Sequence, residues 1–106
     1  FWEMNKLNLF YTTCGEIVDA EVLAKKIITD NFASCVNIIK DIKSFYKENS
    51  KINSVKEIIL IIKTVKEFKE IEFYLNDNHP YDTPFIAELN TNKINTEYLK
   101  WISQNL

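Results

Sequence analysis

The amino-acid sequence predicts a single α+β domain, and three observations support that class. The chain has 106 residues, of which 46% are hydrophobic and 13% aromatic, which suits one packed core and not two. Short β-rich runs alternate with segments whose apolar residues recur at helical spacing. The richest apolar run, Ile58–Ile62, is far shorter than the roughly 20 residues that cross a bilayer. We assign the domain to residues 4–106 and treat residues 1–3, which precede Met4, as an extension outside it.

Residues 6–12 predict the first strand, and a helix should follow it. Polarity alternates along this run, so the face that carries Leu7 is expected to meet the core. Thr13 and Glu16 have the spacing of a capping box, and apolar residues then recur at helical intervals. The first helix is therefore predicted to begin here and to end near Asn31.

A long β-hairpin and a second helix are predicted next. Residues 33–39 and 52–64 are rich in β-formers, and the polar run 47–51 between them is typical of a hairpin tip. Residues 64–67 repeat the capping-box pattern, and an amphipathic helix is expected from there to about Asn78.

The last third predicts a bend, a short strand and a terminal helix. Pro80 and Pro84 bracket the bend, residues 85–89 favour a strand, and residues 96–104 favour a helix. The whole order is that of a ferredoxin-like βαββαβ sandwich with a long β-hairpin and a short C-terminal helix. In that fold both main helices cover one face of an antiparallel sheet.

The strand segment Ile58–Ile62 predicts self-association. Its apolar residues are consecutive and not alternate, which indicates burial on both faces of the sheet. Both main helices are needed on one face, so the second face requires cover from outside the protomer. Closed cyclic symmetry is the usual solution, although the pattern does not fix the number of subunits.

Charge and composition exclude several classes of partner. The net charge is −2, and all thirteen basic residues are lysine, so neither a field for polyanions nor an arginine fork is present. We expect no nucleic-acid and no membrane partner. No secretory signal is visible and the two cysteines form no close metal-ligand pair, so a cytoplasmic location with free thiols is expected.

Three segments carry a resemblance to a known family. They are residues 32–38 (FASCVNI), residues 58–64 ending in Ile-Lys-Thr, and above all residues 79–84 (HPYDTP) followed by Ile86. Their order and spacing resemble the CutA family of divalent-cation tolerance proteins over residues 7–105. The resemblance implies a ferredoxin-like protomer, a homotrimer joined through edge strands and the long hairpin, and an association with copper and other divalent metals.

The candidate metal ligands are His79, Asp82 and Cys14. His79 is the only histidine, and imidazole binds Cu(II) well, although the same residue could simply order the bend before Pro80. Asp82 could add an oxygen ligand or remain a solvated turn residue. Cys14 adjoins the start of a helix, where the dipole can lower a thiol pKa. Positions where some family members carry further donors hold Thr12, Asn78 and Phe85, so any copper site is expected to be weak.

Two other groups of residues bear on function. Cys35 lies in an apolar β run and is expected to be buried in the core. Lys63, Tyr81 and Trp101 could line a ligand or cofactor cleft with His79, although aromatic residues at such spacing more often serve packing.

An enzyme is not expected. The sequence has no Ser-His-Asp spacing, no Cys-x-x-Cys pair, and only one glycine, which is too few for a phosphate loop. The sequence therefore favours a non-enzymatic trimer for divalent-metal (copper) tolerance. The alternative is a PII-like trimeric sensor of a small ligand, or an interaction scaffold.

Overall fold

The structure is a computed structural model, and it describes residues 6–105. Within that range the chain forms four strands and three helices, which confirms the α+β prediction. The elements are β1 (Asn8–Cys14), α1 (Ile17–Thr29), β2 (Cys35–Glu48), β3 (Lys51–Thr64), α2 (Phe68–Asn78), β4 (Ile86–Leu89) and α3 (Thr96–Gln104). Among these helices none combines the length and apolar character needed to span a membrane.

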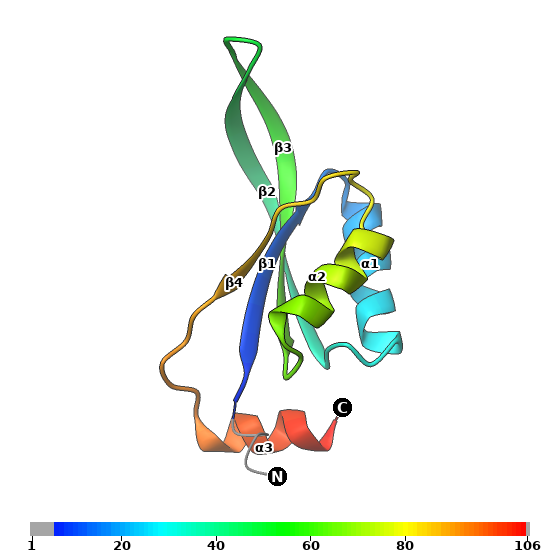
Figure 1. Cartoon of the computed structure of the whole chain (residues 1–106), viewed down its shortest axis with the longest axis vertical. Helices are drawn as coiled ribbons and strands as arrows, with labels where there is room; N and C mark the ends of the chain where they lie inside the picture. The colour runs from blue at the N-terminus through cyan, green and yellow to red at the C-terminus, as the bar shows by residue number, and fades with distance from the viewer. Residues whose placement is uncertain (1–5, 106) are drawn as a thin grey trace.

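The four strands form one antiparallel sheet in the order β2-β3-β1-β4. Helices α1 and α2 both lie on one face of this sheet, and α3 lies across the end where β1 begins (Figure 1). Apart from α3, the other face carries no helix among the described residues. The helix-covered face and the open face therefore have different environments.

The hairpin of β2 and β3 is the longest feature of the molecule, and it rises well beyond the helices (Figure 1). Its tip is a two-residue turn, because Glu48 pairs with Lys51 while Asn49 and Ser50 have φ values of 53° and 65°. Two consecutive positive φ angles give a turn whose twist matches the strands. A bulge lies near the base, where Asp41 has φ 61° and the register shifts between Ile39 and Ile42.

The core lies between the sheet and the helices α1 and α2. On β1 the buried side chains belong to alternate residues, Asn8, Phe10, Thr12 and Cys14. The prediction that the Leu7 face meets this core is wrong: Leu9 and Tyr11 are half-buried on the open face. Both faces of β1 carry apolar residues, so alternation alone did not identify the core side. Leu7 is buried, but ahead of the strand.

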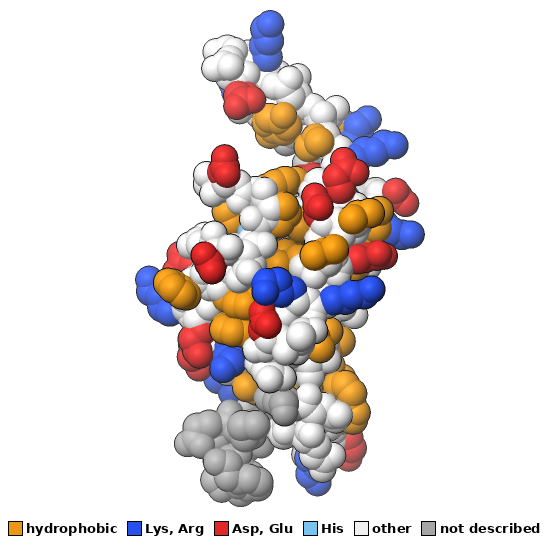
Figure 2. All heavy atoms as spheres, turned by 90° about the vertical axis from the view of Figure 1, so that its right-hand side faces the viewer, with side chains coloured by type: hydrophobic (Ala, Val, Ile, Leu, Met, Phe, Trp, Pro, Cys, Tyr) orange, Lys and Arg blue, Asp and Glu red, His pale blue; other side chains and the backbone are white. Residues whose placement is uncertain are grey.

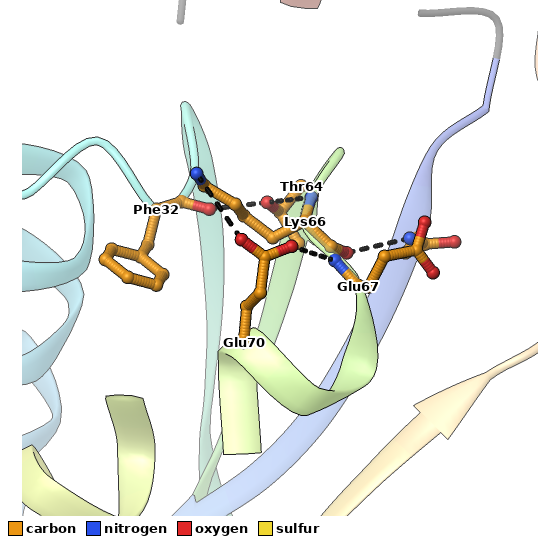
Figure 3. Close-up of polar contacts among 6 residues, drawn as sticks. Phe32, Thr64, Lys66, Glu67 and Glu70 are labelled. Carbon is orange, nitrogen blue, oxygen red and sulfur yellow. Dashed lines mark hydrogen bonds and ion pairs between the residues drawn. The ribbon is translucent and has the colours of Figure 1, made fainter. Parts of the chain in front are cut away.

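Neither predicted capping box forms at its predicted position: the box of α1 is absent, and the box of α2 is displaced toward the C-terminus of the chain. α1 has Glu16 as its N-cap and no side-chain cap. Ahead of α2, the Thr64 hydroxyl donates to the Phe32 carbonyl and accepts from the Lys66 N–H at 2.9 Å (Figure 3). The cap of α2 is instead Glu67, whose N–H donates to the Glu70 carboxylate at 3.1 Å (Figure 3).

Segment Ile58–Ile62 is fully covered on one face only. Ile58, Leu60 and Ile62 are buried under the helices, whereas Ile59 and Ile61 are half-buried on the open face of the protomer. The helix side of the molecule presents lysines and acidic residues interspersed with apolar side chains (Figure 2).

Candidate functional site

A chain of polar side chains crosses the base of the hairpin. It comprises Thr12 on β1, Ser44 on β2, Glu57 on β3, and His79 and Tyr81 just after α2, and we call it the hairpin-base cluster. Residues far apart in the sequence meet there because β1, β2 and β3 are adjacent strands and the bend after α2 returns toward them.

His79 is the inner end of this cluster, and both of its ring nitrogens are engaged. Nδ1 lies 3.0 Å from the Tyr81 backbone nitrogen, and Nε2 lies 3.1 Å from the Thr12 hydroxyl oxygen. A backbone N–H can only donate, so Nδ1 must be the acceptor in this contact. In the neutral ring Nε2 then carries the proton and donates to Thr12.

This arrangement keeps His79 neutral and makes it a poor base. Burial lowers the pKa of the imidazole below its ordinary value of 6.5, and a hydrogen bond with the Thr13 backbone opposes the shift. The contact with Thr12 could suggest a nucleophile and its base. Nε2 already holds a proton, however, so it cannot take one from the Thr12 hydroxyl. The pair therefore fixes the bend after α2 and does not activate a nucleophile.

Tyr81 and Glu57 form the outer half of the cluster. The Tyr81 hydroxyl donates to Glu57 Oε2 at 2.8 Å, and the Ser44 hydroxyl donates to Oε1 of the same carboxylate at 2.7 Å. Burial, followed by the contact with Glu57, raises the pKa of Tyr81, so the phenol stays protonated. Gly15 permits this approach, because a Cβ there would lie 3.2 Å from the Tyr81 hydroxyl oxygen. Tyr81 thus ties the bend to the hairpin.

Cys14 lies beside this cluster, but its environment opposes the predicted reactivity. The side chain is buried, and desolvation raises the pKa of the thiol to about 11, with the charges of Asp19 and Glu57 acting in the same direction. The expectation of a lowered thiol pKa is therefore wrong, because burial and two nearby carboxylates outweigh the dipole of α1. At neutral pH the sulfur is protonated, which is the wrong form for a metal ligand.

The three predicted metal ligands do not form a site within one protomer. Among residues 6–105, no group of three His, Cys, Asp or Glu side chains is close enough to hold an ion. His79 has both nitrogens engaged, Cys14 holds its proton, and Asp82 is exposed in the bend. The residues of a protomer therefore do not fit a resident copper ion.

The three residues predicted to line a cleft lie in two separate parts of the protomer. Tyr81 lies with Glu57, whereas Lys63 lies six residues further along β3, roughly 20 Å away at the rise of a strand. Lys63 and Trp101 come together through Tyr98: the Lys63 Nζ is 5.2 Å from the Tyr98 ring centroid, and the Tyr98 and Trp101 rings are 5.6 Å apart. One cleft containing Lys63, Tyr81 and Trp101 is not present in the protomer.

Cys35 lies beside Tyr98 of α3 and not in the core. It is only partly buried, and its cross-strand partner is Lys63. The prediction of a core position is wrong, because β2 is an edge strand and Cys35 lies at its start. Burial, followed by a hydrogen bond with Cys35, raises the pKa of the Tyr98 phenol.

A hollow of about 410 Å³ opens beside the hairpin-base cluster. Glu57 belongs to both, and the rest of the lining comes from the start of α1, the bulge of β2, and β3. Its lining residues are Gly15, Glu16, Ile17, Lys40, Asp41, Lys56, Glu57 and Ile58. The lining carries both acidic and basic side chains.

The sequence analysis did not identify Glu57, Ser44 or Tyr98. Glu57 and Ser44 are polar residues on strands with many other polar residues, so no motif distinguishes them. Their pairing depends on the register beyond the bulge, where Ile42 lies opposite Glu57. Only the long hairpin prediction could have suggested that the two strands place these side chains near each other.

Comparison with known proteins agrees with this fold. Residues 8–105 match the family model described as CutA1 divalent ion tolerance protein. The divalent-cation tolerance protein CutA of Archaeoglobus fulgidus is 34% identical over 100 residues, which cover 93% of this chain and 97% of that protein. The divalent-cation tolerance protein CutA of Pyrococcus horikoshii is 30% identical over 95 residues, covering 89% of this chain and 92% of that protein.

A solved structure shows the same likeness in three dimensions. The crystal structure of the divalent ion tolerance protein CutA1 from Ehrlichia chaffeensis superimposes with a TM-score of 0.89 at 26% identity, and the match covers 95% of each chain. The family model and these relatives span almost the whole described chain. This chain belongs to the CutA1 divalent ion tolerance family.

Proposed function

We propose that this protein acts in divalent-cation tolerance as a non-enzymatic homotrimer of ferredoxin-like protomers, and that the assembled trimer is the functional unit. The family membership supports the role in tolerance. The engaged nitrogens of His79 and the protonated thiol of Cys14 support a non-enzymatic role, because neither group is free to act as base or nucleophile.

The observation that carries the proposal is the apolar surface on the hairpin. Ile52 and Phe45 are 78% and 67% exposed in the protomer, and Tyr46, Val55 and Ile39 are also exposed. A soluble protein rarely leaves so many large apolar side chains on one projecting element without a partner. Burying them against further copies of the chain, together with the open face of the sheet, would remove this surface from water.

In this proposal, copper binding depends on the assembly of subunits. One protomer does not supply a site that fits copper, so a copper site would need donors from more than one subunit. Such a site would be weak, because His79, the only histidine, is not expected to be a ligand: its Nδ1 accepts from the Tyr81 N–H and its Nε2 contacts Thr12.

The cytoplasm remains our proposed location. Cys14 and Cys35 are both free thiols, which suits a reducing compartment. The structure from Archaeoglobus fulgidus, 34% identical to this chain with a TM-score of 0.85, is described as that of a periplasmic divalent cation tolerance protein, covering 94% of this chain and 98% of its own. Fractionation of the source cells with an antibody against the protein distinguishes the two compartments.

One sample tests both assembly and metal. Light scattering should report a mass of three protomers, and Cu(II) titration of the same sample should count bound metal per protomer. The His79→Ala variant should bind as much copper as the parent, because the imidazole has no free lone pair. A stable monomer would contradict the trimer, and loss of copper binding in His79→Ala would show that His79 is a ligand after all.

A PII-like sensor of a small ligand is the second candidate. The hollow of about 410 Å³ beside the hairpin base favours it, because Glu57 belongs to both the hollow and the contact that holds Tyr81. A ligand that attracts Glu57 would therefore loosen the bend after α2. Two-dimensional NMR during titration with metabolite pools separates the candidates, since only a sensor should show saturable shifts at Glu57 and Tyr81 without metal.

A further inference from the structure

The two main helices form a groove on the side of the molecule that faces away from the open sheet face. Helices α1 and α2 lie side by side there (Figure 1), and a hollow of about 110 Å³ opens between the middle of α1 and the end of α2. Its lining residues, which we call the helix groove, are Asp19, Val22, Leu23, Lys26, Asn78 and Pro80. The assembly proposed above covers the open face and the hairpin, so the helix groove lies on its outer surface.

Apolar side chains border the helix groove at the surface. Val22 lines it and is 61% exposed, and Val18, one helical turn earlier on the same side of α1, is 65% exposed. Pro80 adds an apolar wall from the bend after α2. Figure 2 looks onto this side of the molecule and shows apolar side chains between charged ones. An apolar stripe beside a hollow is typical of a surface that receives a side chain of a partner.

Charge is distributed unevenly along the helix groove. The Lys26 ammonium donates to Asp30 at 3.2 Å, and the same carboxylate accepts from the Tyr74 hydroxyl at 2.7 Å. The positive charge in the lining is therefore balanced within the protein. Asp19 lies seven residues before Lys26, roughly 10 Å away along the axis of α1. Asp77, near the end of α2, is exposed as Asp19 is, so the end of the groove away from Lys26 is acidic.

These features fit one kind of occupant. An amphipathic helix places apolar anchors, four residues apart, into a groove on its partner. A cavity of about 150 Å³ holds benzene, so a hollow of about 110 Å³ has room for one aliphatic side chain. The acidic end favours a partner with lysine or arginine beside its anchor, because complementary charges at the rim of an interface fix its orientation.

We propose that the helix groove binds a basic amphipathic helix of a partner protein, with an aliphatic anchor beside Val22 and Pro80 and a basic side chain beside Asp19. A second apolar side chain of the partner, one turn from the anchor, covers Val18. The interaction needs no metal. It is separate from the tolerance role proposed above, and each protomer of an assembly offers one such groove.

A synthetic peptide with blocked ends is the probe for this site. It has about 15 residues, with leucines four residues apart, an arginine one turn before each leucine and alanine elsewhere, so that it forms an amphipathic helix. Fluorescence anisotropy of the labelled peptide measures binding to the native oligomer. We expect saturable binding of one peptide per protomer. Replacing the leucines by serine should weaken binding at least about tenfold, because the apolar anchors are lost.

Asp19→Lys and Glu21→Lys form a matched pair of protein variants. Both residues are exposed on α1 and both changes alter the net charge equally, but only Asp19 lines the groove. Asp19→Lys should weaken binding at least about fivefold, whereas Glu21→Lys should stay within about twofold of the parent. Thermal melting and light scattering show whether each variant keeps the fold and the mass of the parent.

Val22→Ser and Ile28→Ser form the apolar pair. Both side chains are exposed on α1, but only Val22 lines the groove, so only Val22→Ser should weaken binding, by at least about fivefold. Absence of saturable binding to the parent, or equal effects within either pair, would overturn the proposal. Pairing of oligomers at high protein concentration that Val22→Ser abolishes would assign the groove to a second copy of this chain and would also overturn it.

Discussion

At the scale of single residues, the two cysteines show how far local environment overrides residue type. Cys14 adjoins the N-terminus of α1, where a reactive thiolate is often found. It is nevertheless buried, with its pKa raised to about 11, whereas Cys35 in an apolar run is partly exposed. A sequence pattern cannot reveal which side of a strand is covered, and that coverage decides the chemistry of each thiol.

Cys14 should resist thiol reagents in the folded protein. With a pKa of about 11, only about one thiol in a thousand is ionised at pH 8, and burial excludes the reagent as well. In the Cys35→Ser variant, labelling at pH 8 should be at least about 100-fold slower than in denaturant. Mass spectrometry of timed samples measures the rate. Labelling of the folded variant at the rate of the unfolded chain would show that Cys14 is accessible.

His79 should make stability depend on pH just below neutrality. The pKa of the folded imidazole is lowered from 6.5, so on acidification the unfolded chain takes up a proton before the folded chain does. The free energy of unfolding should therefore be fully retained above about pH 6.5 and should fall as the pH drops below it. Urea unfolding at a series of pH values between 5 and 8 measures this slope.

His79→Gln is the control for that slope. His79 is the only histidine, so the variant has no other side chain with an ordinary pKa in this range. Its free energy of unfolding should be lower than that of the parent by about 1 to 3 kcal/mol above pH 7, because a buried hydrogen-bond network is disturbed. The slope between pH 5.5 and 6.5 should disappear. An unchanged slope would assign the effect to other groups.

At the scale of secondary-structure elements, the hairpin-base cluster holds the bend after α2 against the sheet. Tyr81 is the connection, since its backbone meets His79 and its hydroxyl meets Glu57. The bend itself contains Pro80 and Pro84, which have no backbone N–H to donate, so side chains help to hold it in place. Tyr81 is therefore a structural tie between α2 and β3.

Tyr81→Phe should lower stability by about 1 to 2 kcal/mol, because it removes one donor and leaves the half-buried Glu57 with Ser44 alone. The ring stays in place, so the fold should be kept. Chemical denaturation measures the loss. The double variant Tyr81→Phe with Glu57→Gln should cost less than the sum of the two single variants if the contact is real. Simple additivity would mean that the two side chains do not interact.

The hairpin tip offers a test of backbone strain. Ser50 has φ 65°, a conformation that costs a residue with a Cβ about 1 kcal/mol relative to glycine. Ser50→Gly should therefore raise the free energy of unfolding by up to about 1 kcal/mol. Ser54→Gly, within β3, is the matched control and should lower it by a similar amount, because glycine weakens a strand interior. Equal effects of the two variants would contradict the turn geometry.

The elements themselves could be predicted because their signals are local. Helical spacing predicted the end of α2 at Asn78, and the bounds of α3 match residues 96–104. The extent of the hairpin was underestimated, since β2 continues to Glu48 through polar residues that do not look β-rich. The site was less accessible to prediction: the roles of Glu57 and Tyr98 arise from contacts between distant segments, and no periodicity within one segment records them.

At the scale of the whole molecule, the protomer leaves apolar side chains uncovered on the open sheet face and on the hairpin. The chain measures 50 × 27 × 24 Å, an elongated shape for its length, because the hairpin extends past the helices. An elongated protomer buries less of its own apolar surface than a round one. The consecutive apolar residues of Ile58–Ile62 leave Ile59 and Ile61 half-buried on the open face, which the proposed assembly would cover.

Assembly should depend on the hairpin and not on exposed apolar residues in general. Ile52 on the hairpin and Phe73 on α2 have almost equal exposure in the protomer, 78% and 80%. Ile52→Asp should place a charge in the buried interface of the proposed trimer, where an unpaired carboxylate is strongly unfavourable. Phe73→Asp changes the helix face, which no subunit is proposed to cover. Light scattering across a range of protein concentrations should therefore show dissociation of the Ile52 variant at micromolar concentration and an intact trimer for the Phe73 variant. If both variants dissociate, the helix face belongs to the interface, and if neither does, the hairpin surface is not what holds the subunits together.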